Sequence, residues 1–410
     1  MLGPVLDTSG TARISEDGRR WMAAAGSVLA DSRGAGEAAA RHALAGADPR
    51  LLMVFCTLTR DPEAVLAGVG AASGDLPVLG CSARRMITPT GPTSDGVVVV
   101  ALGGPGLEVT TGVGIGVTDE PRDAGAEAAR QALGDWTSRP NEVLLLVTDG
   151  LAGNQEEVLA GAYSVVGASL PLVGGSSTPD WATGRSFQFY GDKVISDGVL
   201  AAIVSSDGPL GIGLGHGWRK VGKPMLVTRS VGRDVFTLDD KPALPAYLQQ
   251  LGAPPETYTD PVAFKEFARP RPVGIRRRSG EEIRNVNSVA GLSEGWLRAG
   301  AEVPEGCLVW VMEGELESVI DGGRDACRSA IEALDGSPPL GFLTFDCVAR
   351  ASMLGDAGTC AEVARMTEVG HTAGQPDPVP LGGLYTCGEI ARTSGINGFH
   401  NEMVVVLALG

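Results

Sequence analysis

Three segments of this 410-residue chain end in small polar side chains that could bind a ligand. Each has a short apolar run, then a glycine, then hydroxyl or thiol residues: LPVLGCSARRMI begins at residue 76, LPLVGGSSTPDW at residue 170 and VPLGGLYTCGEI at residue 379. Open α/β sheets place their ligands at such strand ends, where backbone amides and small polar groups are exposed. The pattern favours a polar-lined pocket, with packing spacers and turn formers as an equal alternative.

The last segment and the chain that follows it contain the most reactive candidates. Glu389, next to the apolar Ile390, could accept a ligand ammonium group or act as an acid or base with a raised pKa. Equally, it could cap a helix or pair with Arg392. His400 and Asn401 precede the final strand and could donate hydrogen bonds to a ligand's carboxylate or amide, although a satisfied loop histidine is the commoner outcome.

A further polar pair follows the apolar run at 340–345. Cys347 and Arg350 stand at the end of this predicted buried strand. An arginine can make a bidentate contact with a carboxylate, a geometry that lysine cannot copy. The alternative is an ion pair at a domain interface, and the sequence leaves both interpretations open.

Cysteine chemistry is the main enzymatic alternative. Cys81 or Cys387 could act as a nucleophile on a small metabolite, with His400 as the base, Glu389 nearby and glycine amides as oxyanion donors. No local motif enforces that pairing, and a free buried cysteine is more often a small apolar residue than a nucleophile. The sequence therefore favours a binding protein over an enzyme.

The apolar runs belong to a repeated order of elements. A strand at 51–58, a helix at about 62–72, the LPVLG strand and a strand at 95–104 recur at 143–204 and again at 340–410. A strand followed by a crossover helix favours parallel pairing, and the last strand extends the sheet. The sequence predicts an α/β fold of repeated strand–helix–strand units that form mixed sheets packed with helices.

Composition and charge exclude several classes of protein. The formal net charge of −16 would repel phosphate backbones, so no nucleic-acid partner is expected. No run approaches the length of a membrane span, and the first residues do not resemble a signal peptide, so we expect a cytoplasmic protein without a membrane partner. The seven cysteines and four histidines are scattered without metal-ligand spacing, so neither a metal nor a cofactor is expected.

Two glycine-rich patterns do not make nucleotide sites. The stretch 217–224 has the spacing of a phosphate loop, but Pro224 stands where a Ser or Thr hydroxyl must reach magnesium. The alternating glycines at 211–217 lack both the order and the strand-to-helix context of a dinucleotide fingerprint.

The chain resembles the FIST (F-box and intracellular signal transduction) family over residues 20–410. The resemblance rests on GCSA at 80–83, on FYGDKVISDGVLAAIV at 189–204 and on the ending FDCVAR, GGLYTCGEIA and GFHNEMVVVLAL. Family members often continue the first GCS with Gly-Glu, whereas this chain has Arg84 and Arg85. The resemblance implies two intimately associated modules, one N-type and one C-type. The Pro-rich stretch 252–272 predicts a linker-like segment, and the order of elements places the boundary near 220, so we expect the N-type module at 20–220 and the C-type module at 221–410.

The resemblance also implies a function. FIST modules are thought to be sensory domains that bind amino acids and their derivatives. We therefore expect a cytoplasmic signal-transduction protein that binds such a metabolite and passes its signal to a separate protein partner. A structural or adaptor protein without a ligand is a further alternative. We expect the three polar tips to line one hollow with Glu389 facing inward, and the predicted ligand-binding residues are Cys81, Ser82, Ser176, Ser177, Cys347, Arg350, Tyr385, Cys387, Gly388, Glu389, His400 and Asn401.

Overall fold

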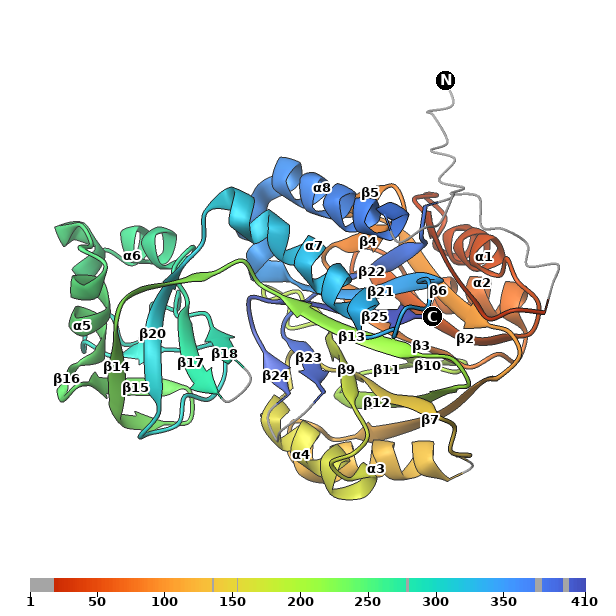
Figure 1. The fold of residues 1–410 in the computed structure, drawn as a ribbon, viewed down its shortest axis with the longest axis horizontal. Coiled ribbons are helices and arrows are strands. Elements are labelled where there is room, and N and C mark those ends of the chain that lie inside the picture. Colours follow the sequence, from red (N-terminus) through yellow and green to blue (C-terminus); the bar gives the residue numbers. More distant parts are fainter. Residues whose placement is uncertain (1–17, 135, 153, 278–279, 373–377, 394–397) are drawn as a thin grey trace.

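The protein consists of a large body and a small lobe (Figure 1). The computed structural model describes residues 18–410 except 135, 153, 278–279, 373–377 and 394–397. Residues 219–313 form the small lobe at the left of Figure 1, and the remaining residues form the body. No helix in these described ranges is both long and apolar enough to cross a membrane.

The body contains three copies of one order of elements. The first copy is β1 (Trp21–Ser27), α1 (Ser32–Ala43), β2 (Pro49–Thr57), α2 (Pro62–Ser73), β3 (Val78–Ala83), β4 (Met86–Thr88), β5 (Gly91–Thr93) and β6 (Val97–Gly103). The second is β7 (Leu107–Ile115), α3 (Pro121–Leu133), β8 (Asn141–Thr148), α4 (Gln155–Val166), β9 (Leu172–Ser176), β10 (Gln188–Tyr190), β11 (Lys193–Ile195) and β12 (Gly198–Ser206). The third is β13 (Leu210–Gly215), α7 (Leu316–Glu332), β21 (Gly341–Cys347), α8 (Val348–Thr372), β22 (Leu381–Thr386), β23 (Glu389–Arg392), β24 (Phe399–His400) and β25 (Val404–Leu409).

Each copy builds one mixed sheet in the same way. The strand orders are β1-β6-β2-β3, β7-β12-β8-β9 and β13-β25-β21-β22. Among these four strands of each copy only the last pair is parallel, because a helix crosses between those two strands, and the other two pairs are antiparallel. The predicted α/β fold of repeated units in mixed sheets is therefore confirmed.

The short hairpins exchange between the copies. The β10–β11 hairpin of the second copy pairs with β3 of the first, and β23–β24 of the third pairs with β9 of the second. The β4–β5 hairpin of the first copy pairs with β22 of the third, which closes the cycle. Every sheet of the body is thus completed by a neighbouring copy.

The central strands of the three sheets are apolar on both faces, because one face packs in the central core and the other packs under helices. Along β2, Met53 and Phe55 contribute to a central core shared by the three sheets, whereas Leu52 and Val54 pack in the layer under α1 and α2. The helix pairs α1–α2, α3–α4 and α7–α8 lie on the outside of the body in Figure 1. This two-sided burial explains the continuous apolar runs of the sequence.

A glycine recurs in the second parallel strand of each copy for a steric reason. A Cβ atom added at this position would lie 1.7–1.9 Å from the carbonyl oxygen of the facing residue in the first parallel strand. The glycines and their facing residues are Gly80 with Val54, Gly174 with Leu146, and Gly383 with Thr344.

The small lobe is an insertion between β13 and α7 of the third copy. It contains β14 (Arg219–Val231), β15 (Asp234–Leu238), β16 (Lys241–Pro242), α5 (Ala243–Gln250), η1 (Pro255–Tyr258), α6 (Pro261–Ala268), β17 (Val273–Arg277), β18 (Gly280–Arg284), β19 (Leu297–Arg298) and β20 (Leu308–Glu313). Its own apolar core includes Tyr247 and Phe264. Arg219 and Glu313 face each other in the β14–β20 pair, so the chain enters and leaves the lobe at one place.

The Pro-rich segment 252–272 lies inside this lobe. It contains η1 and α6, and the elements before and after it, α5 and β17, also belong to the lobe. The segment therefore does not connect the lobe to the body. The division into modules at residues 20–220 and 221–410 stays a prediction, and residue 220 lies near the start of β14.

Candidate functional site

A cavity of about 640 Å³ lies between the body and the small lobe. The body contributes the ends of β8 and β9, the first turn of α4 and the turn after β22, and the lobe contributes the β14–β15 turn and residues 300–302. The residues that line it are Gly150, Leu151, Ala152, Asn154, Gln155, Glu156, Ser176, Trp181, Gly232, Arg233, Gly300, Ala301, Glu302, Cys387 and Phe399.

The three repeated strand ends converge beside this cavity. The Thr178 amide donates to the Ser82 carbonyl oxygen (N···O 3.1 Å), and the Thr178 hydroxyl donates to the Tyr385 carbonyl oxygen (O···O 2.5 Å). The Cys387 amide donates to the Ser176 carbonyl oxygen (N···O 3.2 Å). The three tips thus meet, but they form hydrogen bonds with one another. Of the residues predicted to bind the ligand, only Ser176 and Cys387 line the cavity.

The polar side chains of the first two tips are hydrogen-bonded to neighbouring loops. The Ser82 hydroxyl accepts a hydrogen bond from the Phe187 amide (3.3 Å). The Ser177 hydroxyl accepts one from the Gly150 amide (3.0 Å) and lies 2.6 Å from the Ser186 hydroxyl. Cys81 belongs to the central core, and burial raises the pKa of its thiol well above the usual value.

Cys387 reaches the cavity as a neutral thiol. Burial, with a smaller contribution from the nearby Glu389 carboxyl group, raises the pKa of Cys387 to about 12. His400, the predicted base, directs its Nε2 atom at the Ala391 carbonyl oxygen (2.9 Å). Burial also lowers the pKa of His400. A thiol that stays protonated at neutral pH is a poor nucleophile, so the geometry adds no support to the enzymatic alternative.

Glu389 is completely buried and does not line the cavity. Its Oε1 atom accepts a hydrogen bond from the Thr386 hydroxyl (2.7 Å), and its Oε2 atom accepts one from the Met403 amide (3.3 Å). Burial raises the pKa of Glu389 well above its usual value, although these two hydrogen bonds oppose the shift. The side chain therefore faces inward, as expected, but into the protein interior.

Arg350 lies at the centre of a buried ion cluster. Its guanidinium donates to Asp346 Oδ1 (3.0 Å), to the His216 carbonyl oxygen (2.6 Å) and to the Val319 carbonyl oxygen (2.9 Å). It also pairs with Glu362. Burial raises the pKa of Glu362 well above its usual value, and Asp346 adds to this effect. The donors of Arg350 are thus directed at acceptors within the protein.

The remaining predicted residues are also buried around the third strand end. Burial raises the pKa of Cys347, and it raises that of Tyr385, in each case well above the usual value. Gly388 allows the Phe399 ring to approach, because an added Cβ atom would lie 2.1 Å from that ring. Asn401 is buried behind Gly300, a residue of the cavity lining. Its Oδ1 atom lies so close to Gly300 that a Cβ atom added there would be 2.7 Å away.

Two carboxylates of the cavity were not among the predicted residues. Glu156 lies in the first turn of α4, after the N-cap Asn154, and Glu302 comes from the lobe. Buried Arg284 donates to Glu156 Oε1 (3.1 Å) and to the Glu302 carbonyl oxygen (3.1 Å). It also donates to the Phe399 carbonyl oxygen (3.2 Å), so it joins the lobe to the body.

The two carboxyl groups interact directly. Burial raises the pKa of Glu156, the Arg284 guanidinium opposes this effect, and the charge of Glu302 and its hydrogen bond to Glu156 add to it. The two acidic side chains therefore form a part of the lining that can accept a cationic group such as an ammonium. Sequence reasoning missed the pair because 145 residues separate its members and because Glu156 is an ordinary acidic residue for the start of a helix.

The cavity lining also contains a positively charged side chain. Arg233 is an exposed cation on the β14–β15 turn, and Trp181 is 59% exposed on the body. Acids and a cation on one lining can bind the two ends of a zwitterion. Within the described ranges, no three His, Cys, Asp or Glu side chains are grouped as a metal site.

Part of this chain resembles a curated protein. It is 25% identical over 191 residues to the uncharacterized protein MJ1623 of Methanocaldococcus jannaschii, a match that covers 44% of this chain and 36% of the relative. The chain thus spans about a third of the length of that curated relative.

Solved structures give only weak likenesses. Thermotoga maritima PurL complexed with FGAR has a TM-score of 0.24 and 12% identity, covering 99% of this chain and 76% of that one. Phosphoribosylformylglycinamidine synthase II of the same organism has a TM-score of 0.22 and 12% identity, covering 99% and 75%. Scores this low support no conclusion about fold or function.

Family models give the clearest match. The FIST N domain matches residues 50–241 and the FIST C domain matches residues 243–392. Their junction lies inside the small lobe, between β16 and α5, so both matched regions contribute to the lobe and to the body. Because the two models together match most of the chain, this protein belongs to the FIST family, with a FIST N domain followed by a FIST C domain.

Proposed function

We propose that this protein is a sensory protein that binds an amino acid or a similar metabolite in the cavity between body and lobe. FIST domains are generally described as sensory, ligand-binding domains of signalling proteins. The observation that carries the proposal is the meeting of Glu156 from the body with Glu302 from the lobe on one cavity wall.

The carboxyl pair suits a primary ammonium group. Two carboxylates side by side repel each other. Arg284 forms an ion pair with Glu156, but it also pairs with Glu282. An ammonium group has three donors and can bridge both carboxylates. Arg233, an exposed residue of the cavity lining, supplies a cation for the ligand's carboxylate.

The position of the cavity suits a conformational signal. A ligand that touches both the body and the lobe stabilises the arrangement in which all of these contacts form. The lobe would then differ in position or mobility between the free and bound states, and a separate protein partner would read that difference. The seven cysteines are free thiols, which supports the proposal of a reducing, cytoplasmic location.

A thermal-shift screen tests this function. We expect at least one amino acid to raise the melting temperature of the wild-type protein, because a ligand bound to the native state stabilises it. Glu302→Gln should weaken the binding of that ligand about 10- to 100-fold in calorimetric titrations, because a charge-assisted hydrogen bond contributes about 1.5–3 kcal/mol. Glu302 is exposed, so this substitution should leave the fold intact.

Glu256→Gln is the matched control. Glu256 is an exposed glutamate of η1 in the same lobe and does not line the cavity. The Glu256→Gln variant should bind the ligand with the same affinity as the wild type. A screen in which no amino acid changes the melting temperature, or equal weakening by both variants, would contradict the proposed function.

A further inference from the structure

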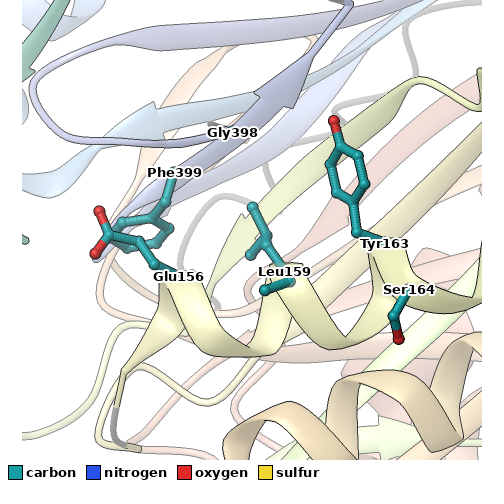
Figure 2. A pocket seen from close by; sticks show the side chains of 7 residues that line it. Glu156, Leu159, Tyr163, Ser164, Gly398 and Phe399 are labelled. Atoms are coloured by element: carbon teal, nitrogen blue, oxygen red, sulfur yellow. The ribbon is translucent and has the colours of Figure 1, made fainter. Parts of the chain in front are cut away.

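An apolar groove adjoins the proposed ligand cavity. It has a volume of about 410 Å³ and runs along α4, facing Phe399 of β24. Figure 2 shows Glu156 at one end of the groove beside Phe399, Leu159 in the middle and Tyr163 towards the other end. Its lining residues are Glu156, Leu159, Ala160, Tyr163, Ser164, Gly398 and Phe399, and most of the lining surface is apolar.

The groove and the cavity share two residues, Glu156 and Phe399. The Glu156 carboxyl group therefore stands at the junction between a polar compartment and an apolar one. Phe399 is held there firmly, because it is 5% exposed, its ring packs over Gly388, and its carbonyl oxygen binds Arg284. A molecule whose ammonium group binds Glu156 can thus extend a side chain into the groove.

The first copy of the repeat provides an internal comparison. A groove of about 460 Å³ runs along α2, and Glu63, Leu66, Ala67 and Gly70 line it at the positions that match four groove residues of α4. The matching residues are Glu156, Leu159, Ala160 and Tyr163. A groove at this place is therefore a product of the repeat itself, and it carries no function alone.

Two differences between the grooves favour a ligand-binding role for the groove along α4, in the second copy. The groove along α2 shares no residue with the ligand cavity, and its Glu63 is exposed. The groove along α4 has the half-buried Tyr163 where the other has Gly70. The Arg392 guanidinium stacks on the Tyr163 ring and fixes its orientation, so the ring adds an aromatic edge to the groove. Only the groove along α4 combines an apolar lining with a carboxyl group that also faces the cavity.

We propose that this groove is the side-chain subsite of the ligand site, so that the preferred ligands are amino acids with large apolar side chains. This inference rests on the proposed function and deepens it by naming the ligand class. The ammonium group binds between Glu156 and Glu302, and the side chain packs against Leu159, Tyr163 and Phe399. Apolar burial then selects leucine or phenylalanine over glycine and alanine.

Calorimetric titrations with glycine, alanine, leucine and phenylalanine test the inference. The wild type should bind leucine or phenylalanine about 10- to 100-fold more tightly than glycine, the range of discrimination that apolar pockets achieve. Ala160→Trp fills the groove and should abolish this preference, while glycine affinity stays within about twofold. Ala67→Trp places the same side chain in the groove along α2 and should retain the wild-type preference.

The outcomes separate the inference from the proposed function. If glycine and alanine bind through Glu302 but side-chain size does not change affinity, the inference is overturned and the proposed function stands. Equal weakening of glycine and leucine by Ala160→Trp also overturns it. If no amino acid binds the wild type, both the inference and the proposed function are overturned. Should the tryptophan variant fail to fold, Ala160→Leu fills less of the groove and should reduce the preference in the same direction.

Discussion

Buried acids contribute to the way the stability of this protein depends on pH. Burial raises the pKa of Glu402 to about 8, although the nearby Arg350 guanidinium opposes this shift. Glu362 and Glu389 are shifted in the same direction by burial. Between the unfolded pKa near 4.5 and the higher folded pKa, the folded state binds protons that the unfolded state releases. These acids therefore favour folding at low pH, and their contribution declines as the pH rises.

We predict that Glu402→Gln flattens this dependence. Between about pH 5 and 8, the free energy of unfolding should fall by about 1.4 kcal/mol less per pH unit in the variant, because one titrating proton is removed. Urea denaturation over this pH range measures the slope. Glu256→Gln, at an exposed position, should keep the wild-type slope, and identical slopes for Glu402→Gln and the wild type would contradict the prediction.

The residue types of the candidate site were only partly predictable from the sequence. Ser176 and Cys387 could be found because each follows a repeated apolar strand and a glycine. Glu389 and Arg350 have suitable chemistry but lie in the protein interior, where other groups of the chain already bind them. Burial of a polar side chain depends on tertiary packing, which the local pattern around these residues does not contain.

At the scale of elements, the repeated glycine allows the two parallel strands of each copy to pack closely, because a side chain at this position would clash. Gly80, Gly174 and Gly383 stand where a Cβ atom would overlap the facing carbonyl oxygen. That oxygen belongs to the backbone of a central strand, so it cannot rotate away like the end of a flexible side chain. The requirement recurs in all three copies, which explains why the glycine follows each apolar run.

We predict that Gly80→Ala destabilises the protein by about 1–3 kcal/mol or more, the cost of inserting an atom into a packed core. The free energy of unfolding in urea measures the effect. Gly70→Ala is the control, because nothing lies within 4 Å of a Cβ atom added there on α2. It should stabilise the helix by about 0.5–1 kcal/mol, and equal effects of the two substitutions would contradict the steric explanation.

The main strands and helices could be predicted, but the exchanged hairpins could not. The strand predicted at 51–58 corresponds to β2 and the helix predicted at 62–72 to α2, because long apolar runs and an Asp-Pro start are strong local signals. The hairpins β4–β5 and β10–β11 have strands of three residues and read as loops. Their pairing partners lie in other copies, and local sequence does not specify such long-range pairing.

At the scale of the whole molecule, the cyclic exchange makes the three copies depend on one another. β9 needs the β23–β24 hairpin of the third copy, and β4 needs β22. Met86 and Ile87 of β4 are completely buried and would be exposed without that partner. No copy can complete its sheet by itself.

We predict that a fragment of residues 18–206, which contains the first two copies, does not fold. It should show no cooperative thermal transition by circular dichroism and little dispersion of its amide proton resonances, because two of its sheet pairings lack a partner. Co-expression with residues 207–410 should restore a folded complex. A cooperative transition in the isolated fragment would contradict the interdependence of the copies.

The attachment of the small lobe has a mechanical consequence. Two adjacent strands, meeting at Arg219 and Glu313, connect the lobe to the body, and β14 extends from there for 13 residues to the turn that bears Arg233. At about 3.3 Å per residue the strand has a contour length of roughly 40 Å, although register shifts such as the one between Val221 and Met225 bend it. Arg284 of the lobe also hydrogen-bonds to Glu156 and to the Phe399 carbonyl oxygen of the body, so a rotation at this attachment that widens the entrance must first break these two contacts.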